Sequence, residues 1–324
     1  MKKIAYLLLV LMVLSLTGCG NQAKTTPQAP KVTEATILNP VGPLVFTAAG
    51  LEDKKVDTKG LDIKVNYWKT NDEAIALLSS KRAEFAVLPV TMAANLSASG
   101  IKLKMLGVHE WKVFYMVAAP GTKYTSFKDL KGQQIYVPVG KGSTIDVLLT
   151  AALNQAGLKP GVDANVVYAP PQEIVALFKS GKVKYAALPE PFVTLASMGG
   201  KGQVVVDFQK YWAQISGSPE RMPIAGLFVT DEFATQHPTE TAQVADAFAA
   251  SIDWGNKNVD KALLVSSKTL PVPAPAMKAA LARIEFKYVA AADCQAETEA
   301  FLKKMQELDP TGIKQIPGAD FYAK

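Results

Sequence analysis

The chain has 324 residues, of which 35 are basic and 29 acidic, so its formal net charge is +6. An excess this small over such a length indicates no nucleic-acid partner. The only cysteines are Cys19 and Cys294, which excludes a small fold stapled by disulfides. About 300 residues without disulfides need large hydrophobic cores, and the length suggests two lobes.

The N-terminus reads MKKIAYLLLVLMVLSLTGC, two lysines followed by an apolar run from Ile4 to Leu14. That run is too short to span a membrane and is typical of a signal peptide, here residues 1–18. The ending Leu-Thr-Gly-Cys resembles the bacterial lipobox, which implies lipidation of Cys19; an ordinary cleaved signal with an incidental cysteine is the alternative. Residues 19–36 are polar and contain proline, as in a flexible linker. We therefore expect a lipid-anchored protein on the outer side of the inner membrane or in the periplasm.

The body of the chain contains an internal repeat with an offset of one hundred residues. Residues 71–100 match residues 171–200 in an ordered series: Glu73/Glu173, Ala76/Ala176, Leu77/Leu177, Ser80/Ser180, Ala86/Ala186, Leu88/Leu188, Pro89/Pro189, Ser97/Ser197 and Gly100/Gly200. At nearly the same offset, NPVG at 39–42 faces VPVG at 137–140. The series indicates one structural unit used twice.

Both copies alternate between strand and helix patterns. The first copy gives strands at 34–40, 61–68, 83–90 and 101–108, with helices at 40–52, 71–82 and 91–99 between them. The second gives strands at 133–139, 165–170 and 184–191 and helices at 142–158, 172–181 and 192–200. This alternation predicts an α/β protein with two lobes, each a mainly parallel sheet flanked by helices.

Two segments are expected to connect the lobes, 113–121 and 222–233. A run of helices at 239–308 has no sheet of its own and is expected to pack back on the first lobe. We therefore predict a discontinuous lobe 1 of residues 37–116 and 226–324, and a lobe 2 of residues 117–225. Two crossings make a hinge, so the lobes are expected to close over a ligand.

Candidate ligand-binding residues follow from this arrangement, because ligands of open parallel sheets bind beyond the carboxyl ends of the strands. Four matched turns, two PVG and two LP, lie at such ends, where helix N-termini can hold an anion or polar group. Gly42, Pro89, Gly142, Ser143 and Thr144 belong to these turns. Asn39, Thr70 and Thr91 offer further polar groups, although Ser143 and Thr144 can also act only as helix caps.

Two longer motifs carry a family resemblance. SFKDLKGQQIYVPVGKGSTIDVLLTAALNQAGL, 126–158, and LFKSGKVKYAALPEP, 177–191, resemble the solute-binding proteins of the nitrate/sulfonate/taurine and thiamine-pyrimidine class. Lys184-Tyr185 stands where that family usually has aspartate. The resemblance implies a type II periplasmic-binding-protein fold and service to an ABC permease and its ATPase. It also implies that Glu190, in Glu-Pro, lies at the cleft, although a carboxylate held by neighbouring backbone is the alternative.

Other chemistries find little support in the sequence. Gly142 separates Lys141 from Ser143, so the order needed for a P-loop is absent. A hydrolase needs a base, and the chain has only His109, which could line the cleft, and His237, which is expected at the surface. Cys294, on an expected helix, reads as a plain thiol and cannot supply a cysteine-rich iron motif. We expect no metal, no cofactor and no enzymatic activity.

The ligand class is the least determined point. Arg221 is the only arginine that falls near the expected cleft, because Arg82 and Arg283 fall in expected surface helices. Trp68 and Trp111 follow strands and could form flat apolar walls, unless both are packing residues. Such a site suits a small organic solute, aromatic or heterocyclic, better than nitrate. We expect a monomer; a ligand-binding sensor of the same fold that signals to a membrane receptor remains open.

Overall fold

The structure is a computed structural model that describes residues 32–138, 140–270 and 272–324. The predicted signal peptide, Cys19 and the linker up to residue 31 lie outside these residues. The linker was expected to reach residue 36, but the first strand, β1, already begins at Glu34, where it pairs in parallel with Asp62. Within the described ranges, no helix is both long enough and apolar enough to cross a membrane.

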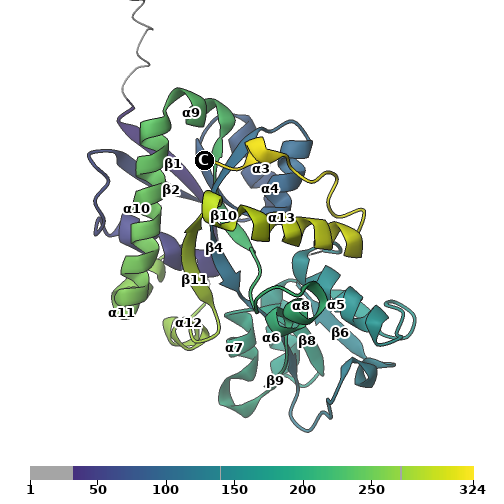
Figure 1. Ribbon diagram of the computed structural model, residues 1–324. Coiled ribbons are helices and arrows are strands. Elements are labelled where there is room, and N and C mark those ends of the chain that lie inside the picture. The colour runs from purple at the N-terminus through teal and green to yellow at the C-terminus, as the bar shows by residue number, and fades with distance from the viewer. Residues whose placement is uncertain (1–31, 139, 271) are drawn as a thin grey trace, which may run out of the picture. The chain divides into compact units, whose positions relative to one another are not determined.

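Lobe 1 is built on a six-stranded sheet in the order β11-β4-β10-β3-β1-β2 (Figure 1). Its strands are β1 (Glu34–Pro40), β2 (Asp62–Trp68), β3 (Phe85–Pro89), β4 (Leu103–Lys112), β10 (Ala225–Thr230) and β11 (Glu285–Ala290). Its helical segments are η1 (Pro43–Ala48), α2 (Ala49–Glu52), α3 (Asn71–Ser79), α4 (Val90–Ala98), α9 (Asp231–Gln236), α10 (Pro238–Lys257), α11 (Val259–Ser266), α12 (Ala274–Ala280), α13 (Ala291–Leu308) and η4 (Ala319–Phe321).

Lobe 2 is built on a five-stranded sheet in the order β7-β6-β8-β5-β9. Its strands are β5 (Phe114–Ala118), β6 (Gln134–Val137), β7 (Asn165–Tyr168), β8 (Tyr185–Pro189) and β9 (Gln203–Asp207). The helical segments are η2 (Phe127–Leu130), α5 (Thr144–Gln155), α6 (Pro171–Lys179), α7 (Phe192–Ser197), η3 (Met198–Gly200) and α8 (Phe208–Ser216). The predicted α/β fold with two lobes is thus confirmed.

The strand pairing corrects one part of that prediction, because both sheets are mixed instead of mainly parallel. In lobe 1, β1 pairs in parallel with β2 and β3, whereas β10 pairs antiparallel with β3 and β4, and β11 antiparallel with β4. In lobe 2, β6 pairs in parallel with β7 and β8, but β5 pairs antiparallel with β8 and β9. The segments expected only to connect the lobes supply β5 and β10, and the expected all-helical run at 239–308 supplies β11.

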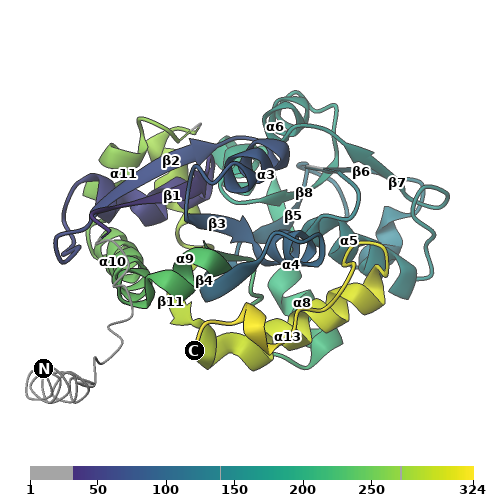
Figure 2. The same cartoon turned by 90° about the horizontal axis from the view of Figure 1, so that it is seen from above.

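Continuous apolar strands run through the middle of each sheet because helices cover both faces. Along β3, Phe85 and Val87 pack with one hydrophobic core, and the alternate residues Ala86 and Leu88 pack with the other. Helix α10 packs on η1, α2 and β11, whereas α4 packs on β3 and α13 on β4. In lobe 2, α5 and α8 pack with one core and α6 and α7 with the other. Figure 2 shows α6 and α8 on opposite sides of this sheet.

The chain crosses between the lobes at two adjacent places. Strand β4 ends at Lys112 and β5 begins at Phe114, so Val113 is the single residue that links these two strands across the lobes. The returning segment runs beside it: the N–H of Met222 donates to the carbonyl of Trp111, and the N–H of Ile224 to the carbonyl of Glu110. The lobes also touch through α12 against α7 and through α13 against α5. The crossings place the carboxyl ends of strands from both sheets around one cavity.

Candidate functional site: a cleft between the lobes

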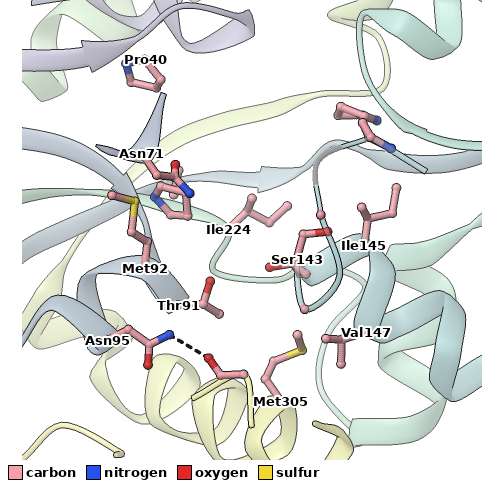
Figure 3. Close-up of a pocket in the computed structure, with 18 of the residues that line it drawn as sticks. Pro40, Asn71, Thr91, Met92, Asn95, Ser143, Ile145, Val147, Ile224 and Met305 are labelled. Atoms are coloured by element: carbon pink, nitrogen blue, oxygen red, sulfur yellow. Dashed lines mark hydrogen bonds between the residues drawn. The ribbon is translucent and has the colours of Figure 1, made fainter. Parts of the chain in front are cut away.

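A cavity of about 770 Å³ lies between the two lobes, a volume typical of small-molecule sites. The turns after β1 and β6 and the last residues of β3 and β8 all contribute to its lining, together with both crossing segments. Residues 305–314, at the end of α13 and beyond it, complete the wall. In Figure 3, Thr91 and Met92 of lobe 1 lie across an open space from Ser143, Ile145 and Val147 of lobe 2.

The N-terminus of α5 opens into this cleft. Its approach is fixed by Asp146, whose carboxylate accepts hydrogen bonds from the N–H of Gly142 at 2.8 Å and the hydroxyl of Tyr168 at 2.7 Å. Gly142 has a φ of 86°, a conformation that glycine adopts without strain. Ser143 is the N-cap but makes no capping bond, and its buried hydroxyl has no partner in the described chain. The first-turn N–H groups of α5 are therefore free to receive a polar or anionic group.

The opposite wall comes from β3 and α4 of lobe 1. Pro89 ends the strand, and the N–H of Val90 donates to the carbonyl of Ile224, which ties this turn to the second crossing. Further along α4, Asn95 donates to the carbonyl of Gly312 at 2.7 Å and accepts from the N–H of Lys314 at 3.0 Å (Figure 3). The C-terminal segment is thereby held at the rim of the cleft.

Apolar side chains form most of the remaining surface. Trp68, Phe114, Ile224 and Met305 line the cavity together with several prolines. Trp68 is buried, and its indole N–H has no partner within the described ranges. An apolar wall with a few unmet polar groups is the surface expected of a site for an organic molecule.

One of the two acids on the lining, Glu110, is buried, with an exposed fraction of 4%. Its Oε1 has no hydrogen-bond partner among the residues that the structure describes. Burial without a compensating charge raises the pKa of this carboxyl group to about 8. The other charged residues on the lining are Lys141, Asp309 and Lys314, and no arginine of the described chain is among them. The described residues contain no group of three His, Cys, Asp or Glu side chains placed to hold a metal.

Seven of the thirteen residues expected at the ligand site lie on the lining of this cleft: Gly42, Trp68, Pro89, Thr91, Gly142, Ser143 and Thr144. They come from the ends of β2 and β3, from the turns after β1 and β6, and from the first residues of α4 and α5. The repeat therefore brings the expected turns of both lobes to one cavity.

Three of the remaining expected residues, all in lobe 1, serve its packing and local structure. Asn39 donates to the carbonyl of Leu44 at 3.1 Å. Thr70 caps α3 by accepting from the N–H of Glu73 at 3.3 Å. His109 is fully buried, edge-on to the ring of Phe248, and burial lowers its pKa to about 3.

The other three form two ion-pair clusters outside the lining. Arg221 stacks over the ring of Trp111 at 4.3 Å and pairs with Glu297 at 2.7 Å. Glu190 is buried, accepts from the N–H of Thr194 at 2.9 Å and pairs with Arg283. Trp111 and Arg221 are therefore occupied with each other, and Glu190 is held by both a backbone donor and an arginine.

Several lining residues escaped the sequence interpretation. Glu110 lies between His109 and Trp111, which the sequence did indicate as candidates. A single acid in an apolar strand, however, does not indicate that the residue faces a cavity. Asn71 is the first residue of α3, and Asn95 lies in α4, which directly follows β3. A search for polar residues near the turns of the repeat could have found both. Met305 and Lys314 come from a C-terminal segment that has no counterpart in the repeat.

Comparisons with known proteins agree with this geometry. An aliphatic sulfonates-binding protein of Bacillus subtilis (strain 168) is 23% identical over 81% of this chain and 76% of its own length. Among solved structures, an ABC transporter from Parabacteroides distasonis has a TM-score of 0.74 at 22% identity, over 90% of this chain and 99% of that one. The periplasmic aliphatic sulphonate binding protein SsuA from Escherichia coli has a TM-score of 0.69 at 20% identity, covering 90% and 91%.

The nitrate-binding protein NrtA from Synechocystis PCC 6803 has the same fold, with a TM-score of 0.66 at 14% identity over 90% of this chain and 93% of that one. These likenesses confirm the resemblance drawn from the sequence motifs. The family model for NMT1-like proteins matches residues 88–267, more than half of the sequence, from the end of β3 to just beyond α11. The chain therefore belongs to the NMT1-like family.

Proposed function

We propose that the protein is the extracytoplasmic solute-binding component of an ABC importer, and that it holds a small organic solute in the cleft between its lobes. The observation that carries the proposal is the cleft itself, which joins apolar walls to the open N-terminus of α5. Solved neighbours described as an ABC transporter and as sulphonate- and nitrate-binding proteins favour import over the sensor alternative.

The geometry supports a solute with an anionic head and an apolar body. Ser143 and the first N–H groups of α5 would receive the head, since helix N-termini favour negative charge. Arg221, the arginine first considered for this role, is engaged by Glu297 and Trp111. The sulfonate-binding relative supports a sulfonate as the head group.

A thermal-shift panel tests this function. Alkanesulfonates, aromatic acids, pyrimidines and nitrate should be compared, because a ligand at 100 times its Kd stabilises the folded state by about 2.7 kcal/mol. We expect an alkanesulfonate to raise the Tm and nitrate to have a smaller effect. Stabilisation by nitrate alone would contradict the proposed organic solute.

Two matched serine variants locate the head group. Ser143→Ala should weaken alkanesulfonate binding roughly tenfold, because hydrogen bonds to charged groups contribute about 1.5–3 kcal/mol. Its Tm without ligand should stay unchanged, since this hydroxyl has no partner within the described chain. Ser99 also lines the cleft, but its hydroxyl already donates to the carbonyl of Asn95 at 2.8 Å, so Ser99→Ala is the control. Equal losses in both variants would place the head elsewhere.

The rest of the proposal concerns the cellular setting. We infer attachment to the outer face of the cytoplasmic membrane through a lipid on Cys19, with an ABC permease and its ATPase as partners and binding in place of catalysis. The lipobox-like sequence supports the anchor. Cys19→Ser should abolish incorporation of radiolabelled palmitate during expression; undiminished labelling would rule the anchor out.

A further inference from the structure

Glu110 has a setting that simple packing does not explain. It is the only acid of β4, it is one of the residues that line the cleft, and it is 4% exposed. No hydrogen bond or ion pair of its carboxyl group is found among the described residues, and its Oε1 is buried without a partner. A buried polar group left unpaired destabilises the folded state, so its presence calls for a partner that binds there.

The surroundings of this carboxyl group are apolar. The residues opposite Glu110 on the neighbouring strands are Ala225 of β10 and Phe286 of β11, and both are buried. Ile224, which follows in the second crossing, contributes its backbone N–H to the carbonyl of Glu110 and its side chain to the lining. No cation is supplied by any of these three neighbours.

The charged groups of the adjoining elements are engaged or stand at the rim. On β4, Lys112 pairs with Glu285 of β11 at 3.3 Å. Just before the second crossing, Arg221 pairs with Glu297 of α13. The imidazole of His109 is buried at the Phe248 ring and stays neutral, as its lowered pKa requires.

On the cleft lining itself, Lys141 and Lys314 are exposed, and Asp309 accepts from the hydroxyl and N–H of Thr311. A carboxyl group buried without a cation favours its neutral form, since ionisation in an apolar site is penalised. A neutral carboxyl group offers one O–H donor and one carbonyl acceptor side by side.

We propose that Glu110 determines which solutes the cleft accepts, and that its neutral carboxyl group pairs with an amide-type edge of the solute, in which an N–H donor lies beside a carbonyl or ring-nitrogen acceptor. This inference rests on the proposed solute-binding function. Because Glu110 lies where β4 meets the crossing, such a pair anchors the solute against the hinge, while α5 holds the opposite end.

Three probes of similar size test the pairing by calorimetric titration of the full chain: butanesulfonate, amide-terminated carbamoylethanesulfonate and ammonium-terminated aminopropanesulfonate. We expect the amide probe to bind roughly tenfold more tightly than butanesulfonate, the gain that one or two buried hydrogen bonds give. Glu110→Gln should keep this preference, because glutamine also presents a donor beside an acceptor. Glu110→Met, similar in length but apolar, should abolish it.

The outcomes separate this inference from the function on which it rests. Binding of butanesulfonate and the amide probe with equal affinity overturns the role of Glu110 and leaves solute binding intact. Tightest binding of the ammonium probe, lost in Glu110→Gln, overturns the neutral form. If none of the three binds, the sulfonate head of the proposed function fails instead.

A second measurement needs no ligand. The infrared difference spectrum of the wild type minus Glu110→Gln, recorded on the empty protein at pH 7, should contain the band of a protonated carboxyl group. Carboxylate bands in its place would overturn the proposal, whatever the probes bind.

Discussion

Two neighbouring residues of β4 show how burial acts on ionisable groups in opposite directions. Burial lowers the pKa of His109 to about 3 and raises that of Glu110 to about 8, because in each case it disfavours the charged form. His109 is fully buried at the Phe248 ring, whereas Glu110 faces the cleft. The first residue therefore affects stability and the second is available for binding.

Replacement of His109 should remove one contribution to the loss of stability in acid. Between its folded pKa of about 3 and its ordinary value of 6.5, the unfolded chain binds a proton that the folded chain does not. Stability is thus lost as the pH falls, by about 2 kcal/mol from pH 7 to pH 5 for this residue. Urea unfolding should therefore be measured at both pH values for the wild type and His109→Phe. On going from pH 7 to pH 5, the free energy of unfolding of the variant should fall by about 2 kcal/mol less than that of the wild type.

The raised pKa of Glu110 works in the opposite sense, since its contribution to stability is lost as the pH rises toward 8. It is present in both proteins and cancels in the comparison. An identical pH dependence of wild type and His109→Phe would contradict the buried neutral imidazole.

At the scale of elements, the segment between α12 and β11 binds to residues at and just before the start of α7 in the other lobe. Arg283 pairs with Glu190 and also donates to the hydroxyl of Thr194 at 2.8 Å. The Glu190 side chain is 0% exposed and that of Arg283 is 35% exposed. This cluster ties the two lobes together outside the cleft lining.

Removal of the arginine should therefore destabilise the protein. Arg283→Ala leaves the Glu190 charge buried with one partner fewer, and we expect a loss of about 2–3 kcal/mol in the free energy of unfolding, below the full range for buried pairs because Arg283 is partly exposed. The control is Lys278→Ala, which breaks an exposed pair with Asp260 and should change stability by less than about 1 kcal/mol. Equal effects of the two variants would show that the Glu190 cluster is no stronger than a surface pair.

The sequence predicted most elements, because the repeat and the change between strand and helix periods are local signals. It did not predict that residues 114–118 and 225–230 form strands of the sheets. An apolar extended segment has the same sequence pattern whether it connects two lobes or pairs within a sheet. Pairing of β10 with β3 and β4 joins residues more than one hundred positions apart, which no local pattern reports.

The candidate site, too, was predicted only where local sequence patterns determine it. Turn residues such as Gly142 and Ser143 could be found because strand ends and helix starts carry recognisable residues. Glu190 was selected because the family resemblance placed its Glu-Pro at the cleft, but its partner Arg283 lies in a segment that was predicted to be a surface helix. Whether a buried acid has a partner depends on side chains from distant strands, so the unpaired state of Glu110 became visible only in the fold.

At the scale of the whole molecule, the two adjacent crossings predict motion on binding. Val113 and the segment 222–224 join the sheets, and residues at such junctions can absorb a rotation of one lobe against the other. Small-angle scattering with a saturating solute should give a smaller radius of gyration than the empty protein. An unchanged radius at saturation would mean that capture requires no closure.

The most direct test of solute capture is a calorimetric titration of an alkanesulfonate into the wild type and a blocked variant. Thr91 lines the cleft opposite Ser143, so Thr91→Trp should place an indole ring in the cavity and obstruct it (Figure 3). Thr239, exposed in the first turn of α10, provides Thr239→Trp as the control. We predict saturable binding in the wild type and the control and none in Thr91→Trp, at an unchanged Tm. Undiminished binding by Thr91→Trp would contradict capture in this cleft.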